Sequence, residues 1–273
     1  MPLPVSEYRS GSAGRKVGVG TDEPAVTSLE LPQYSVARVL LTWAAASLPM
    51  GVLAWVVAPV LAELLDGPAA WPRAILLSLI LGLAWQLALV AVLVHREQGS
   101  LRWPVLRDAL WLRAPSSPRT GRRGGRLWWL LLPLVAGVAA AEELPALPAP
   151  ANRDLATFLG SESGQSFLSG NWVWFGLILL MMVLNTALGE ELLFRGLLLP
   201  RMQGAFGQAD WVANAVLFAA YHVHVPWAIP GRLVTGTLYA LPSRRYRSAW
   251  MGIAVHSAQT VVLGALVLTL VLR

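Results

Sequence analysis

Residues 74–94, AILLSLILGLAWQLALVAVLV, form an apolar run of 21 residues without a charged side chain. A helix of about 20 apolar residues is long enough to cross the hydrocarbon core of a bilayer. Further apolar runs lie on both sides of this one, and only 13% of the 273 residues are charged. A soluble globular domain has about 25%. The chain is therefore predicted to be an all-α, polytopic membrane protein.

We expect a transmembrane helical bundle of about seven spans, with short or broken helices in the C-terminal half. The breaks are predicted at Pro226, Pro230 and Pro242, because proline removes a backbone donor. Short segments at membrane depth are tolerated where they face protein or a water-filled cavity, so the C-terminal half is predicted to hold a site. The predicted spans are residues 39–61, 74–94, 127–141, 172–188, 211–221, 233–241 and 249–272.

The distribution of charge predicts the domain organisation and the orientation. Eight arginines against two acidic residues lie between Arg96 and Arg126, which matches the whole net charge of +6. A basic loop between spans is typical of the cytoplasmic side, so we expect a multi-pass cell-membrane protein with a cytoplasmic N-terminus and no nucleic-acid partner. The predicted parts are a disordered cytoplasmic tail (1–34), N-terminal transmembrane helices with the basic loop 95–126 (35–170), and a C-terminal transmembrane core (171–273).

Within the basic loop, apolar side chains alternate with arginines. Trp103, Leu106, Leu110 and Trp111 are interleaved with three arginines. This pattern suits a short amphipathic helix on an anionic lipid surface.

Ionisable residues are concentrated in the last third of the chain, in or beside apolar segments. Glu191 and Arg195 are four residues apart, so they share a helix face and can form an ion pair. Glu190 is rotated by about 100° from Glu191 and is free to face something else. Ionisable groups inside a membrane span are costly and indicate function by default.

Two histidines and a threonine complete this set. His222 follows Phe218 by four residues, so an aromatic ring can pack beside the imidazole. His256 and Thr260 are again four apart, which places a ring nitrogen and a hydroxyl on one face. His224, two residues after His222, points in another direction and is interpreted as structural or interfacial.

The chemistry that these residues permit is hydrolysis. A carboxylate with an imidazole can hold and activate a water molecule, and a second imidazole with a hydroxyl can stabilise an oxyanion. Glu190, His222 and His256 could equally hold a divalent metal such as zinc. The absence of cysteine excludes disulfides and a cysteine nucleophile. HExxH, an intramembrane GxSG and a pair of intramembrane aspartates are all missing, which excludes three other classes of intramembrane protease.

These motifs resemble those of the CAAX-prenyl-protease and bacteriocin-processing family, also called CPBP or Abi. EELLFR (190–195) is similar to its EExxxR motif, and FAAYH (218–222) to its FxxxH motif. HSAQT (256–260) lies where the family has HxxxN, with Thr260 in place of asparagine. The resemblance covers roughly residues 172–270.

The resemblance implies an intramembrane endopeptidase that is glutamate-dependent and possibly metal-assisted. Glu190 would be the base that activates water, with His222 helping to hold it. Glu191 would pair with Arg195 and orient the site, and His256 and Thr260 would stabilise the oxyanion. The implied partners are the lipid bilayer and a membrane-anchored or lipidated peptide substrate.

Other interpretations of the same residues remain open. The charged cluster could be a structural ion pair at a helix end, and the histidines could make structural hydrogen bonds between helices. The chain could also be a non-catalytic membrane scaffold or immunity factor on the same fold, which the threonine at position 260 favours. A proton-coupled transporter could use the same ionisable groups, although the repeated halves common in such folds are not found.

Overall fold

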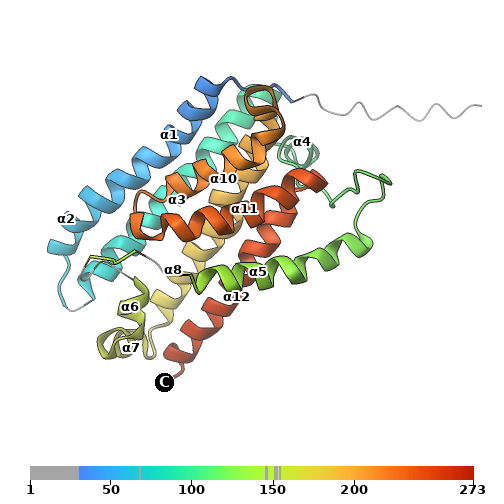
Figure 1. Ribbon diagram of the computed structural model, residues 1–273. Coiled ribbons are helices and arrows are strands. Elements are labelled where there is room, and N and C mark those ends of the chain that lie inside the picture. The colour runs from blue at the N-terminus through green and yellow to red at the C-terminus, as the bar shows by residue number, and fades with distance from the viewer. Residues whose placement is uncertain (1–30, 68, 145–146, 151–152, 154) are drawn as a thin grey trace, which may run out of the picture.

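The computed structural model describes residues 31–67, 69–144, 147–150, 153 and 155–273, and all regular elements in these ranges are helices (Figure 1). Their only β pairing is an isolated bridge between Ser116 and Arg123. The predicted all-α class is confirmed. Residues 1–30 of the predicted tail lie outside the described residues. Its last residues contact the protein, since Tyr34 is buried and its backbone N–H donates to the carbonyl of Arg201 over 2.8 Å.

Five helices of the described chain are long and apolar enough to cross a membrane, as expected of a multi-pass membrane protein. The seven predicted spans are not confirmed. Helix α10 has 12 residues, about 18 Å in length, which is shorter than the roughly 30 Å hydrocarbon core. Helix α11 has 18 residues but carries three arginines, at 232, 244 and 245. The five long helices are Val36–Glu63, Ala70–Gln98, Gly125–Glu142, Trp172–Arg201 and Ala249–Val271.

The elements are listed here in chain order, with π-helical and 3-10 segments labelled η. They are α1 (Val36–Val52), η1 (Leu53–Val57), α2 (Ala58–Glu63), α3 (Ala70–Gln98), α4 (Trp103–Ala109), η2 (Gly125–Leu130), α5 (Leu131–Glu142), α6 (Leu155–Gly160), α7 (Glu162–Leu168), α8 (Trp172–Val183), η3 (Leu184–Gly189), η4 (Leu192–Leu198), η5 (Leu199–Arg201), α9 (Gln203–Phe206), η6 (Gly207–Ala209), α10 (Asp210–Tyr221), η7 (Pro226–Ala228), α11 (Ile229–Tyr246) and α12 (Ala249–Val271).

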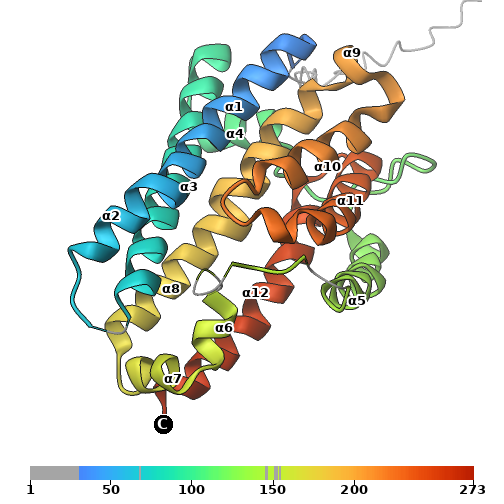
Figure 2. The ribbon, with the colours of Figure 1, turned by 60° about the vertical axis from the view of Figure 1, so that its left-hand side comes forward.

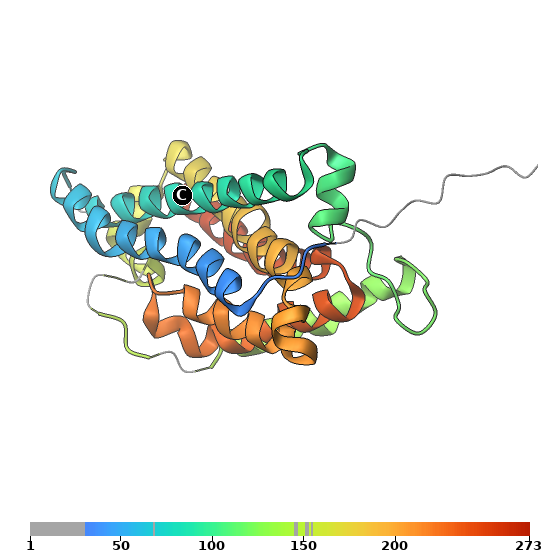
Figure 3. The ribbon, with the colours of Figure 1, turned by 90° about the horizontal axis from the view of Figure 1, so that it is seen from above.

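The long helix that begins with α8 runs through the middle of the bundle. It contacts α3 on one side and α10, α11 and α12 on the other, and Figure 3 shows it between these groups. Helices α1 and α2 pack along α3, while α5 lies at the opposite edge against α11 and α12 (Figures 1 and 2). Residues on this central helix can therefore meet side chains from most of the bundle.

Two prolines do not break the chain where we expected. Pro230 lies in the first turn of α11, where the missing N–H has no helical partner in any case. Pro242 lies inside α11, which continues to Tyr246. The predicted half-length span 233–241 is therefore wrong, and the true break lies between α10 and α11 at Pro226, where the 3-10 turn η7 begins.

The basic loop contains the expected short helix, α4, but its apolar side chains differ in burial. Trp103 is exposed, whereas Leu110 and Trp111 are buried in the protein core. The loop is thus fixed to the bundle, and only part of the predicted lipid-facing surface is available.

Candidate active site

The central helix departs from α-helical geometry on both sides of the adjacent glutamates. The π-helical segments η3 and η4 flank Glu190 and Glu191, whereas the predicted fourth span ended at Leu188. The helix continues to Arg201, so both glutamates lie inside a membrane-spanning element. A π-helical turn holds an extra residue and is frequently found at functional sites.

The predicted pair between Glu191 and Arg195 is confirmed, and both side chains are fully buried. Nη1 of Arg195 lies 3.0 Å from Oε1 of Glu191, and Nη2 donates to the carbonyl of Gly236 on α11 over 3.1 Å. Nδ1 of His256, on α12, lies 3.2 Å from the same Glu191 oxygen. The ion pair therefore connects three helices, Arg195 contacting α11 and Glu191 contacting α12, and these contacts help to hold charges away from water.

A glycine on α12 makes room for this carboxylate. A Cβ atom at Gly252 would lie only 2.4 Å from Oε2 of Glu191 and 3.0 Å from the hydroxyl of Ser243. Such an approach is impossible for a larger residue without movement of the ion pair. The backbone N–H of Gly252 donates to that hydroxyl over 3.1 Å, which fixes α12 against α11.

Glu190 differs from its neighbour in having no ion-pair partner among the described residues. It is 2% exposed, and no described group donates a hydrogen bond to its Oε2 atom. Among neighbouring charges, Arg232 has the largest electrostatic effect on Glu190, followed by Glu191 and Arg195. A buried polar atom without a partner in a native protein needs an explanation, such as a catalytic role or a bound water.

His222 is held in one tautomer by the backbone. Its Nδ1 atom lies 2.9 Å from the carbonyl oxygen of Phe218, and because a carbonyl only accepts, Nδ1 donates. The Nε2 lone pair of the neutral ring is then free to accept a hydrogen bond. The predicted contact with Phe218 is confirmed, with ring centroids 4.9 Å apart. His224 stacks on His222 at 5.4 Å and limits its movement.

Phe218 brings the three motifs together. Its ring lies 4.1 Å from the guanidinium carbon of Arg195 and 6.3 Å from the ring of His256. Tyr239 stacks on the ring of His256 at 4.8 Å and lies 6.0 Å from the ring of Phe218. Residues of the first, second and third motif therefore surround one aromatic ring.

Thr260 lies one turn further along α12 than His256. It is partly exposed, and its hydroxyl has no hydrogen bond to another described residue. Nδ1 of His256 is engaged by Glu191, so the ring can donate through Nε2 only when it is doubly protonated. The oxyanion role expected for these two residues stays a prediction.

Sequence reasoning missed a buried polar pair next to the site. Nε2 of Gln86, on α3, lies 2.5 Å from the hydroxyl oxygen of Tyr221, and both residues are fully buried. Because Gln86 donates, the hydroxyl hydrogen of Tyr221 is free for another acceptor. The ring of Tyr221 lies 5.3 Å from that of His222, and the charge of Glu190 acts on it. A lone glutamine within a 21-residue apolar run was the available signal.

Sequence reasoning also missed Arg232. It lies on α11 and pairs with Glu142 over 2.9 Å. Its charge acts on Glu190, His222 and Tyr239, so it belongs to the electrostatic surroundings of the site.

The predicted metal ligands were tested against the arrangement of donors. Across the described part of the chain, no three His, Cys, Asp or Glu side chains are grouped so that they could hold a metal ion. The Nδ1 atoms of His222 and His256 contact protein oxygens, which leaves Nε2 of each ring as the atom that could bind a metal. The metal site stays a prediction, and no step is derived through a metal.

Comparison with known proteins identifies the same segment. A family described as "Type II CAAX prenyl endopeptidase Rce1-like" matches residues 172–262, which include the first two motifs and His256. No curated protein and no solved structure matches the chain. Over residues 172–262 the chain thus shows the predicted resemblance to the CAAX-prenyl-endopeptidase family, a family of proteases.

Proposed function

We propose that this chain is an intramembrane endopeptidase in which Glu190 activates the attacking water. The observation that carries the proposal is the contrast between two adjacent buried glutamates. Glu191 is held by Arg195 and contacts His256, whereas Glu190 has no ion pair to a described residue. Their segment is similar to an endopeptidase family, which supports hydrolysis over a purely structural role.

In the proposed reaction, Glu190 takes a proton from water as the water oxygen attacks the carbonyl carbon of the scissile peptide. Nε2 of His222 accepts the second hydrogen bond of that water and orients it. The tetrahedral intermediate then collapses, the C–N bond breaks, and the leaving nitrogen receives the proton from Glu190. His256 and Thr260 are proposed to stabilise the oxyanion, and Glu191 with Arg195 to hold the helices in place.

The proposed substrate is a membrane-anchored or lipidated peptide, because Glu190 and His256 lie within helices long and apolar enough to cross a membrane and the matched family is named for prenylated CAAX substrates. We place the protein in the cell membrane with a cytoplasmic N-terminus, following the arginine-rich loop.

The test is cleavage of a peptide library by the full chain reconstituted in vesicles, with and without lipid anchors on the peptides. Wild type is compared with Glu190→Gln and with Glu63→Gln, an exposed glutamate at the end of α2. We expect Glu190→Gln to lose at least about 10²-fold in rate, the usual contribution of a general base, and Glu63→Gln to match wild type. Equal rates for all three proteins would overturn the assignment.

The same assay separates the remaining alternatives. If wild type cleaves nothing while it still binds lipidated peptides, the non-catalytic scaffold is favoured. Activity that disappears with a chelator and returns with zinc would show a metal-assisted reaction. Activity that survives the chelator would leave Glu190 as the direct base.

A further inference from the structure

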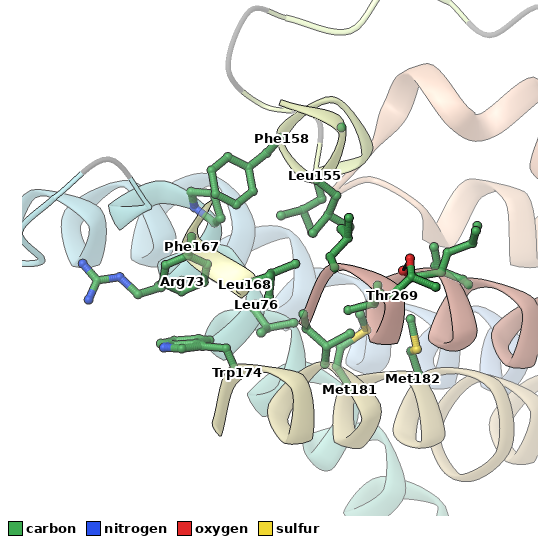
Figure 4. A pocket seen from close by; sticks show the side chains of 18 of the residues that line it. Arg73, Leu76, Leu155, Phe158, Phe167, Leu168, Trp174, Met181, Met182 and Thr269 are labelled. Atoms are coloured by element: carbon green, nitrogen blue, oxygen red, sulfur yellow. Dashed lines mark hydrogen bonds between the residues drawn. The ribbon is translucent and has the colours of Figure 1, made fainter. Parts of the chain in front are cut away.

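A cavity lined by described residues lies away from the candidate active site. It has a volume of about 570 Å³ and is lined by the start of α3, the short helices α6 and α7, the length of α8 and the second half of α12. Figure 4 shows Phe158 and Leu155 on one side of the space and Met181 and Met182 on the other. Its volume falls within the roughly 300–1,000 Å³ that is usual for ligand pockets.

The chain builds one wall of this cavity with a tight turn between α6 and α7. The hydroxyl of Ser161 accepts from the N–H of Gly164 over 3.1 Å and donates to the carbonyl of Phe158 over 2.7 Å. A Cβ atom at Gly164 would lie 2.0 Å from that carbonyl oxygen, so only glycine permits the approach. Phe158 and Phe167 are thereby directed to the same cavity.

Close packing separates the cavity from Glu190. Helices α8 and α12 meet at Gly264, where a Cβ atom would lie 3.5 Å from Leu179. Met182, in the cavity wall, precedes Glu190 by eight residues, which is about 12 Å along a helix. A molecule in this cavity would therefore not occupy the position of a scissile peptide bond.

The charged side chains among the described lining residues of the cavity are both basic. Of the described residues that line it, Arg73 and Arg273 are charged and none is acidic; the rest are apolar except for Thr269. Figure 4 shows the guanidinium of Arg73 directed away from the apolar side chains, at the edge of the space. Nη1 of Arg273 donates to Oε1 of Gln165 over 3.0 Å, so it is held near α7. An apolar interior with a basic edge is complementary to an amphiphile with a negative headgroup.

We propose that this cavity is a specific site for an anionic phospholipid, with an acyl chain among α7, α8 and α12 and the phosphate near Arg73 and Arg273. A polar ligand is excluded by the lining, because burying polar groups without hydrogen-bond partners is costly. The walls are the ends of membrane-spanning helices together with two short helices, where a lipid headgroup and its chain meet. The proposal does not depend on proteolysis.

The test is binding of phosphatidylglycerol and phosphatidylcholine to the purified full chain, counted as lipid adducts by native mass spectrometry. Two variants fill the cavity: Val267→Trp at a buried position and Thr269→Trp at an exposed lining position, which does not disturb the core. The matched control is Val262→Trp, because Val262 is 63% exposed on the same helix. Arg73→Gln tests the charge.

We expect wild type and Val262→Trp to bind one phosphatidylglycerol at least about tenfold more tightly than phosphatidylcholine. Thr269→Trp and a folded Val267→Trp should lose this adduct, and Arg73→Gln should reduce the preference for the anionic lipid. Equal binding of both lipids by wild type would overturn the proposal. So would retention of the phosphatidylglycerol adduct by Thr269→Trp, or an isoprenoid in place of a phospholipid in the extracted protein.

Discussion

Two clusters of charge include residues of the central helix, one at its middle and one where its last residue, Arg201, meets Glu97 of α3. At the end, Oε1 of Glu97 accepts from Arg38 over 2.8 Å and from the hydroxyl of Tyr34, and Oε2 accepts from Arg201 over 2.8 Å. In the middle, Glu191 is paired but Glu190 is not. The first cluster has a donor for each carboxylate oxygen, whereas the second leaves Oε2 of Glu191 without a donor and Glu190 without an ion-pair partner among the described residues.

The comparison distinguishes charged groups that stabilise the fold through ion pairs from a carboxylate that has no such partner. Burial and the hydrogen bond to Glu97 raise the pKa of Tyr34 to about 12, so this phenol stays a donor at all physiological pH values. The Glu97 cluster ties the segment before α1 to α3 and to the end of the central helix. We infer that it is structural, whereas Glu190 is retained for chemistry.

The largest expected effect comes from removing Arg195. Arg195→Ala leaves Glu191 buried without its ion-pair partner, which costs about 3–5 kcal/mol in comparable buried pairs. We expect a much lower melting temperature in detergent and no cleavage. The control is Arg245→Ala, at an exposed arginine of α11, which should melt like wild type. A stable, active Arg195→Ala protein would show that the pair is dispensable.

Glu97→Gln tests the structural cluster. This change removes the charge that Arg201 and Arg38 face, and we expect a loss of roughly 3 kcal/mol in the free energy of unfolding. The cleavage rate per folded molecule should stay within about twofold of wild type, because Glu97 lies at the end of α3, far along the chain from the motifs. A stable but inactive Glu97→Gln protein would contradict a purely structural role for Glu97.

Gly252→Ala tests the space around Glu191. The added methyl group would meet the carboxylate at 2.4 Å, and overpacking of this kind costs about 1–3 kcal/mol. Both stability and cleavage should fall. Gly264→Ala is the matched change on the same helix, since its Cβ atom would make an ordinary contact at 3.5 Å and should be tolerated.

Among these variants, Tyr221→Phe is expected to have the smallest effect on cleavage and stability. Gln86 would lose its partner, and we expect kcat to fall about tenfold with little change in KM, because the pair positions the site rather than binding substrate. Gln86→Leu should have a similar effect, and the double variant should be no worse than either single one. Additive losses would show that the two residues act independently.

The helical class and the contacts within each motif could be predicted from the sequence, because apolar runs and spacings of four residues determine them directly. Glu191 with Arg195 and Phe218 with His222 are contacts of this local kind. The contact between His256 and Glu191 joins residues 65 positions apart, and no spacing rule predicts it.

The incorrect predictions from the sequence have physical causes. The span ending at Leu188 was too short because charges were taken as the end of a helix, whereas π-helical turns and pairing allow it to continue to Arg201. Pro242 was taken as a break, but the helix continues past it. Gln86 and Tyr221 were missed because neither belongs to a motif, and their proximity follows only from the packing of α3 beside α10 and the central helix.

The central claim is that Glu190 is the carboxylate left free for catalysis. The most direct measurement is kcat/KM of Glu190→Gln on a cleaved lipidated peptide, taken on the same preparation as its melting temperature. We expect kcat/KM of Glu190→Gln to fall at least about 10²-fold. Its melting temperature should equal or exceed that of wild type, because an unpaired buried carboxylate has been removed. Cleavage at the wild-type rate, or a fall in melting temperature as large as that of Glu97→Gln, would contradict the central claim.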